Sequence, residues 1–136
     1  MTGTTLRERI AKVASGFLLL ATLTLTANAE VLIAVIIDDL GDNQRKGRRA
    51  LALPGEVTLA VLPHTRWGQD LAQEAHLQQR EVILHLPMAN LANIPLGPDP
   101  LTPQLTRIEF RSRLANALSK VPGARGINNH MGSALT

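Results

Sequence analysis

The 136-residue chain is predicted to be an α/β protein with a parallel sheet, and two features of the sequence support this. Stretches rich in Val, Ile and Leu alternate with stretches whose apolar residues recur at helical spacing, the order expected of strand–helix–strand units. In addition, the first apolar stretch, Val31–Ile37, has no polar alternation, which is typical of a strand covered on both faces. We therefore expect right-handed crossovers between strands that all run in the same direction.

A targeting segment is expected before the first strand. Thr2–Lys12 carries three basic residues, Val13–Thr26 is uncharged and rich in Leu and Ala, and Ala27–Ala29 has the small-x-small pattern of a cleavage site. This layout is typical of a secretory signal peptide at residues 1–29, and the apolar stretch is short for a membrane span. Residues 30–136 are then an exported domain, expected in the periplasm. The alternative is that this segment stays uncleaved as an amino-terminal anchor. It would then be the only part of the protein expected to contact the membrane.

Composition limits the classes of partner that the domain can have. The sequence has no Cys, so an exported domain without disulfides must depend on its apolar core. Without residues 1–29 the formal net charge falls from +3 to +1, which leaves no basis for nucleic-acid binding. The remaining length is enough for one small domain, but a complete α/β barrel typically needs about 200 residues or more.

The first half of the domain is expected to contain one helix between two strands. Gly41–Asn43 reads as a turn after the first strand, and an Asp or Asn side chain in this turn can cap a helix. The helix is expected over Gln44–Leu53, weakened by Gly47, and it ends at Pro54-Gly55. Glu56–Leu62 is then the second strand.

A second helix and a third strand are expected next. Thr65 can cap a helix over Arg66–Gln79, whose apolar residues recur about every four positions. Glu81–Leu86 is the third strand, and Pro87 is expected to end it.

A long loop, a third helix and a fourth strand complete the expected order. Met88–Thr102 contains three Pro, so it is expected to be irregular and is a candidate binding loop or lid. Thr102-Pro103 is a typical helix start, a cap followed by Pro at the first helical position. This helix is expected to end at Pro122-Gly123, and the last strand is expected over Gly126–His130.

Residues able to do chemistry follow each predicted strand. Because the carboxyl ends of parallel strands meet at one edge of a sheet, their side chains are expected to converge there. One carboxylate with two or three imidazoles is the ligand set of a catalytic zinc site, and a second carboxylate can then act as general base. These residues are Asp38, Asp39, His64, His85, Asn129 and His130.

Each of these residues also has a purely structural interpretation. Asp39 could cap the turn before Gly41, and His85 could be a core histidine bonded to a backbone carbonyl. His64 could be an exposed loop residue, and Asn128–His130 could be a polar turn. Only the joint appearance of these residues at successive strand ends favours a site.

Five blocks of the sequence resemble successive motifs of the divergent polysaccharide deacetylase family, which is related to NodB-type carbohydrate esterases. The resemblance covers nearly all of the chain after the predicted signal peptide. The His-Leu-Pro-Met and Asn-Asn-His-Met-Gly-Ser motifs are its most distinctive parts. The blocks are Ile36–Gly41, Leu53–Gly55, Val57–Pro63, Glu81–Met88 and Asn128–Ser133.

The resemblance implies a (β/α) barrel and metal-dependent hydrolysis of acetyl groups on a glycan. It assigns Asp38 as the base and Asp39 as a ligand of a divalent metal, with zinc the expected ion. His85 corresponds by order along the chain to a further ligand, and His130 is the expected partner. Asn129 and backbone N–H groups near Gly132 are candidates for stabilising the oxyanion, and His64 is a possible additional site residue.

The chain also departs from the family pattern. The wider superfamily has two His close together in one motif, whereas this sequence has no such pair. The family continues for about another half domain, so the chain is expected to form only the N-terminal part of the barrel, truncated at its carboxyl end. These departures keep open the alternative of a catalytically inactive glycan-binding or envelope-assembly protein on the same fold.

Overall fold

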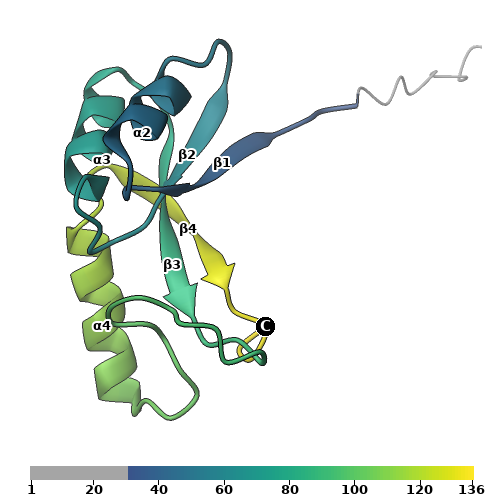
Figure 1. Ribbon diagram of the computed structural model, residues 1–136, viewed down its shortest axis with the longest axis vertical. Helices are drawn as coiled ribbons and strands as arrows, with labels where there is room; N and C mark the ends of the chain where they lie inside the picture. The colour runs from purple at the N-terminus through teal and green to yellow at the C-terminus, as the bar shows by residue number, and fades with distance from the viewer. Residues whose placement is uncertain (1–30) are drawn as a thin grey trace, which may run out of the picture. The chain divides into compact units, whose positions relative to one another are not determined.

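The structure, a computed structural model, describes residues 31–136 of the chain, and the predicted signal peptide lies outside them. Four strands and three helices alternate along these residues, and all neighbouring strands are parallel, in the order β1-β2-β3-β4 (Figure 1). The elements are β1 (Val35–Leu40), α2 (Gln44–Leu51), β2 (Val57–Val61), α3 (Gly68–Leu77), β3 (Val82–Met88), α4 (Arg107–Ser119) and β4 (Ala124–Met131). The predicted α/β class is therefore confirmed, and the open sheet is consistent with part of a barrel.

The three helices lie on one side of the sheet, to the left of the strands in Figure 1. Because each strand adds beside the previous one, right-handed crossovers place every connecting helix on the same face. The core lies between this face and the helices and is aliphatic, since the whole sequence has only two Phe, one Trp and no Tyr. Its largest fully buried side chains are Leu59, Leu71, Leu84, Leu86, Leu101, Val61, Val82 and Val121.

The described helices are all short. Among residues 31–136, none has the length and apolar character needed to cross a lipid bilayer.

Strand β1 is an outer strand of the described sheet, and this corrects one prediction. Val35 and Ile36 are 45% and 46% exposed, although their apolar run predicts burial on both faces. The reason is that β1 pairs only with β2 in the described residues, and no described helix covers its other face. Only Leu40, at the carboxyl end of the strand, is buried.

The ends of α3 and β3 differ from the prediction for local reasons. Thr65 does not cap α3, because its hydroxyl donates to the carbonyl of Leu62 at 2.9 Å and the helix begins at Gly68. Strand β3 continues through Pro87, although Pro has no backbone N–H to donate. The reason is that β2 has already ended at this level of the sheet, so no carbonyl of β2 needs that N–H. The carbonyl of Pro87 accepts instead from the N–H of Leu101 at 2.9 Å.

Helix α4 begins at Arg107, so the predicted start at Thr102-Pro103 is wrong. Thr106 and Glu109 form a capping box in which each side chain accepts from the backbone N–H of the other residue, at 3.3 and 2.8 Å. Two reciprocal hydrogen bonds satisfy two otherwise unpaired donors, which explains why this cap prevails over the one four residues earlier.

The capping box gives a first testable prediction. We expect Thr106→Ala to lower the free energy of unfolding by about 1 kcal/mol at pH 7. Hydrogen bonds from the hydroxyl and backbone of Thr106 lower the pKa of Glu109 below its ordinary 4.5. The contribution of Glu109 is therefore complete above that value and is lost as the pH falls through the lower folded-state pKa. The difference in thermal stability between Thr106→Ala and wild type should thus be smaller at low pH than at pH 7. Thr102→Ala is the control, and a loss of stability at pH 7 equal to that of Thr106→Ala would contradict the assignment of the cap.

Gly47 gives a second prediction because it lies where α2 meets α3. A Cβ atom on Gly47 would lie 2.3 Å from Cδ1 of Leu71, a residue that is 1% exposed and packed in the hydrophobic core. We therefore expect Gly47→Ala to lower the free energy of unfolding by about 1–3 kcal/mol, although Ala normally stabilises a helix relative to Gly. Denaturant unfolding tests this, and the loss should largely disappear when Gly47→Ala is made in a Leu71→Ala background.

Candidate metal site at the carboxyl edge of the sheet

His85 and His130 come from the neighbouring strands β3 and β4 and share one face of the sheet. In the register of the two strands His85 pairs with Asn128 and Pro87 pairs with His130. Successive strand residues point to opposite faces, and Leu84 belongs to the core beneath the helices. His85, Asn128 and His130 therefore point to the face away from the helices. The side chain of His85 is only 4% exposed there.

Asp39 reaches the same face because β1 is bulged. Ile37 pairs with Leu59 and Leu40 pairs with Val61, so β1 has one residue more than β2 over this interval. Asp39 itself has φ of +60°, a left-handed conformation that Asp tolerates better than most residues. A bulge re-aims the side chains next to it. In this chain it lets both Asp38 and Asp39 reach the histidines, although adjacent strand residues normally point to opposite faces.

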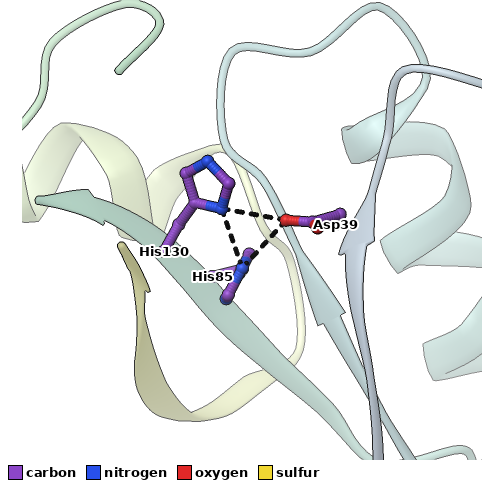
Figure 2. Close-up of side chains that lie close together, drawn as sticks. All are labelled: Asp39, His85 and His130. Atoms are coloured by element: carbon purple, nitrogen blue, oxygen red, sulfur yellow. Dashed lines mark hydrogen bonds and ion pairs between the residues drawn. The ribbon is translucent and has the colours of Figure 1, made fainter. Parts of the chain in front are cut away.

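Asp39, His85 and His130 form a compact cluster (Figure 2). Oδ1 of Asp39 lies 3.1 Å from Nε2 of His85 and 2.9 Å from Nδ1 of His130. The two ring nitrogens are 3.1 Å apart. The structure therefore brings together the three residues that the sequence analysis selected as metal ligands.

The cluster fits a divalent metal in both chemistry and geometry. Two imidazole nitrogens and one carboxylate oxygen are ligands of catalytic zinc sites, in which a fourth position stays free for water or substrate. In a tetrahedral site with metal–ligand distances of about 2.0–2.1 Å, neighbouring ligand atoms lie about 3.3 Å apart. The observed separations of 2.9–3.1 Å are close to this value. Small movements of the side chains would bring all three atoms within coordination distance of one ion.

Asp38 and Asn128 lie beside the cluster, next to Nδ1 of His85, the ring nitrogen that does not face Asp39. The amide nitrogen of Asn128 donates to Oδ1 of Asp38 at 2.8 Å, and its amide oxygen lies 2.8 Å from Nδ1 of His85. The side chain of Asp38 is 48% exposed, so its carboxylate is open to solvent beside the cluster. The sequence analysis did not select Asn128. Its spacing of two residues from His130 in a strand was the signal that could have identified it.

The structure does not bring His64 or Asn129 into the cluster. Nε2 of His64 lies 3.9 Å from Oδ2 of Asp99, and it has no hydrogen-bond partner among the described residues. Asn129 is exposed on the other face of β4, and its amide donates to the backbone carbonyl of Met131. His76, the remaining histidine, is exposed on α3.

The segment between β3 and α4 forms an irregular loop beside this edge of the sheet, as predicted. Leu101 holds it in place through backbone hydrogen bonds to Pro87 and Ala89, at 2.9 and 2.8 Å. The loop lines an open cavity of about 440 Å³. None of the three cluster residues lines this cavity. Asn90 does, and its amide contacts the sulfur of Met131, the residue after His130, at 3.2 Å.

The solved structure of a similar protein has the same fold. The crystal structure of the uncharacterized protein ATU2773 from Agrobacterium tumefaciens C58 matches with a TM-score of 0.65 and 27% sequence identity. The match covers 73% of this chain and 42% of that chain. The parallel arrangement described above therefore recurs in a larger protein.

Two curated proteins are similar to this chain in sequence. The chain is 39% identical over 104 residues to the uncharacterized protein YibQ of Escherichia coli K12, and 31% identical over 108 residues to an uncharacterized protein of Haemophilus influenzae. These matches cover 76% and 79% of this chain but only 33% and 39% of the relatives. The chain thus spans between a third and two fifths of their length.

The family assignment follows from the range of residues that match. The family model for divergent polysaccharide deacetylases matches residues 35–136, from the first residue of β1 to the last residue of the chain. This range contains every member of the cluster as well as Asp38 and Asn128. The chain therefore belongs to the divergent polysaccharide deacetylase family.

Proposed function

We propose that this chain supplies the metal-binding part of an exported deacetylase that hydrolyses acetyl groups on a polysaccharide. The observation that carries the proposal is the cluster of Asp39, His85 and His130, whose three ligand atoms lie within 3.1 Å of one another. Family membership supports the class of substrate. The chain spans only 33% and 39% of the two curated relatives, so the activity of the full-length protein is itself part of the proposal.

The cluster residues would hold a divalent ion, for which zinc is the first candidate. Such an ion lowers the pKa of a water molecule and polarises a carbonyl oxygen, which are the two requirements of acetyl hydrolysis. Asp39 would provide the negative charge of the ligand set, and the two histidines would bind as neutral imidazoles. Since the cluster supplies three ligand atoms, a fourth position would be left for water or the acetyl oxygen.

Asp38 is the proposed general base. Its carboxylate is half-exposed beside the cluster, and one of its oxygens is held by Asn128. In the hydrolysis, the oxygen of water forms a bond to the acetyl carbon, and the bond from that carbon to the sugar nitrogen or oxygen breaks. Asp38 accepts the proton that water loses, and the sugar atom gains a proton as acetate leaves.

The loop between β3 and α4 is the proposed glycan-binding segment. Its cavity is lined by amide side chains, among them Asn90 and Gln104, and by apolar residues such as Leu96. Amides can hydrogen-bond sugar hydroxyls while apolar side chains contact the faces of sugar rings. His64 lies at the margin of this loop, where its Nε2 is 3.9 Å from Oδ2 of Asp99.

Metal analysis combined with an acetate-release assay tests the proposal. Purified wild-type protein should bind one zinc per chain and release acetate from acetylated amino-sugar oligomers, and a chelator should abolish both until zinc is returned. Wild type and Asp39→Ala with equally little zinc would overturn the metal site. Zinc binding without acetate release, over a panel of N- and O-acetylated glycans, would instead support the non-catalytic glycan-binding alternative.

A further inference from the structure

We propose that Asn128 is a positioning residue that holds His85 in the one tautomer able to bind a metal and ties it to Asp38. This inference rests on the proposed metal site and deepens it. The two polar atoms of the Asn128 amide bond to Asp38 and to Nδ1 of His85, and not to any of the three ligand atoms of the cluster.

The orientation of the Asn128 amide follows from its two partners. Oδ1 of Asp38 lies 2.8 Å from the amide and, as a carboxylate oxygen, can only accept a hydrogen bond. The amide group facing Asp38 must therefore be the NH₂ donor. The amide oxygen, an acceptor, is then left to face Nδ1 of His85 at 2.8 Å.

This orientation assigns the proton on His85. An acceptor at 2.8 Å from Nδ1 requires Nδ1 to carry the hydrogen, which leaves Nε2 of the neutral ring with a free lone pair. Nε2 is the atom that faces Oδ1 of Asp39 at 3.1 Å and Nδ1 of His130 at 3.1 Å. The bond to Asn128 therefore prepares Nε2 as a metal ligand.

The alternative tautomer would compete with the metal. With the hydrogen on Nε2, His85 would donate to the carboxylate of Asp39 across the same 3.1 Å, and a proton would occupy the place of the ion. Because the side chain of His85 is only 4% exposed, water does not readily supply another acceptor for Nδ1. Oδ1 of Asp38 also faces Nδ1, but at 3.7 Å it is beyond hydrogen-bond distance. Asn128 is thus the group that decides between a hydrogen-bonded cluster and a metal-binding one.

The test compares Asn128→Leu, which keeps the approximate volume but removes both hydrogen bonds, with the double exchange Asp38→Asn/Asn128→Asp. The double exchange keeps an acceptor for Nδ1 and a donor–acceptor pair between positions 38 and 128. Long-range ¹⁵N–¹H NMR of the metal-free protein reports which nitrogen of His85 carries the hydrogen. Zinc affinity is measured separately by competition with a chelator. Asn116→Leu, on the exposed surface of α4, is the matched control for the loss of an Asn.

We expect the hydrogen on Nδ1 of His85 in wild type and in Asp38→Asn/Asn128→Asp, and its loss from that atom in Asn128→Leu. Zinc affinity should fall about 10–100-fold in Asn128→Leu, the range for groups that orient a metal ligand, and should be unchanged in Asn116→Leu. Wild-type zinc affinity in Asn128→Leu, or a hydrogen on Nε2 in metal-free wild type, would overturn the inference. If wild type binds no zinc, the proposed function fails, whereas the NMR assignment still decides the role of Asn128.

Discussion

Asp39→Asn is expected to lower zinc affinity by more than about 100-fold, beyond the range for groups that act only through a ligand. Asp39 is the only carboxylate of the described cluster, and its Oδ1 is the atom that both ring nitrogens face, at 3.1 and 2.9 Å. Removing the charge leaves two neutral imidazoles, which bind a divalent ion with less electrostatic attraction. Competition with a chelator of known affinity measures the change.

The choice of Asn at position 39 matters because of the backbone. Asp39 has φ of +60°, and Asn tolerates this conformation about as well as Asp, whereas Ala does so at a cost. The exchange therefore removes the charge without adding strain to the bulge. Asp99→Asn is the matched control, since Asp99 is an exposed Asp with φ of +48° outside the cluster. Equal losses of zinc at positions 39 and 99 would contradict the assignment.

The alternation of strands and helices could be predicted because local signals specify it. Apolar runs, helical spacing and Pro-Gly pairs each act within a few residues, and they located every described strand and helix to within a few positions. The exposure of Val35 and Ile36 could not be predicted in this way, because burial depends on which neighbours cover a strand. The prediction of where α4 starts failed for another reason. Thr102 and Thr106 compete as caps, and only Thr106 forms reciprocal hydrogen bonds.

The site was predicted in part. The residues that the prediction missed follow from strand parity, the alternation of successive strand residues between the two faces of the sheet. The ends of parallel strands necessarily share an edge, so Asp39, His85 and His130 could be grouped from the order of the strands alone. Parity also distinguishes Asn128 from Asn129, because only Asn128 shares a face with His130. Parity failed at Asp38 and Asp39, where one extra residue in β1 brings both carboxylates to the same region. A bulge of this kind has no signal in the sequence of β1 alone.

Asp38→Asn should separate catalysis from metal binding. We expect kcat for acetate release to fall about 10²–10⁴-fold, the usual contribution of a general base, while zinc affinity stays within a few-fold of wild type. An Asn at position 38 still offers an oxygen to the amide nitrogen of Asn128, 2.8 Å away in wild type, so the orientation of His85 should be kept. It cannot accept a proton from water at neutral pH.

The contrast between the three variants divides the site by role. Asp39→Asn should lose the metal, Asn128→Leu should weaken it through His85, and Asp38→Asn should retain it but lose turnover. Loss of zinc in Asp38→Asn to the level of Asp39→Asn would show that Asp38 is itself a ligand, and unchanged kcat would remove it as the base. The bulge in β1 is the physical reason to expect a clear division, because it places two adjacent carboxylates near one pair of histidines while only Asp39 contacts both rings.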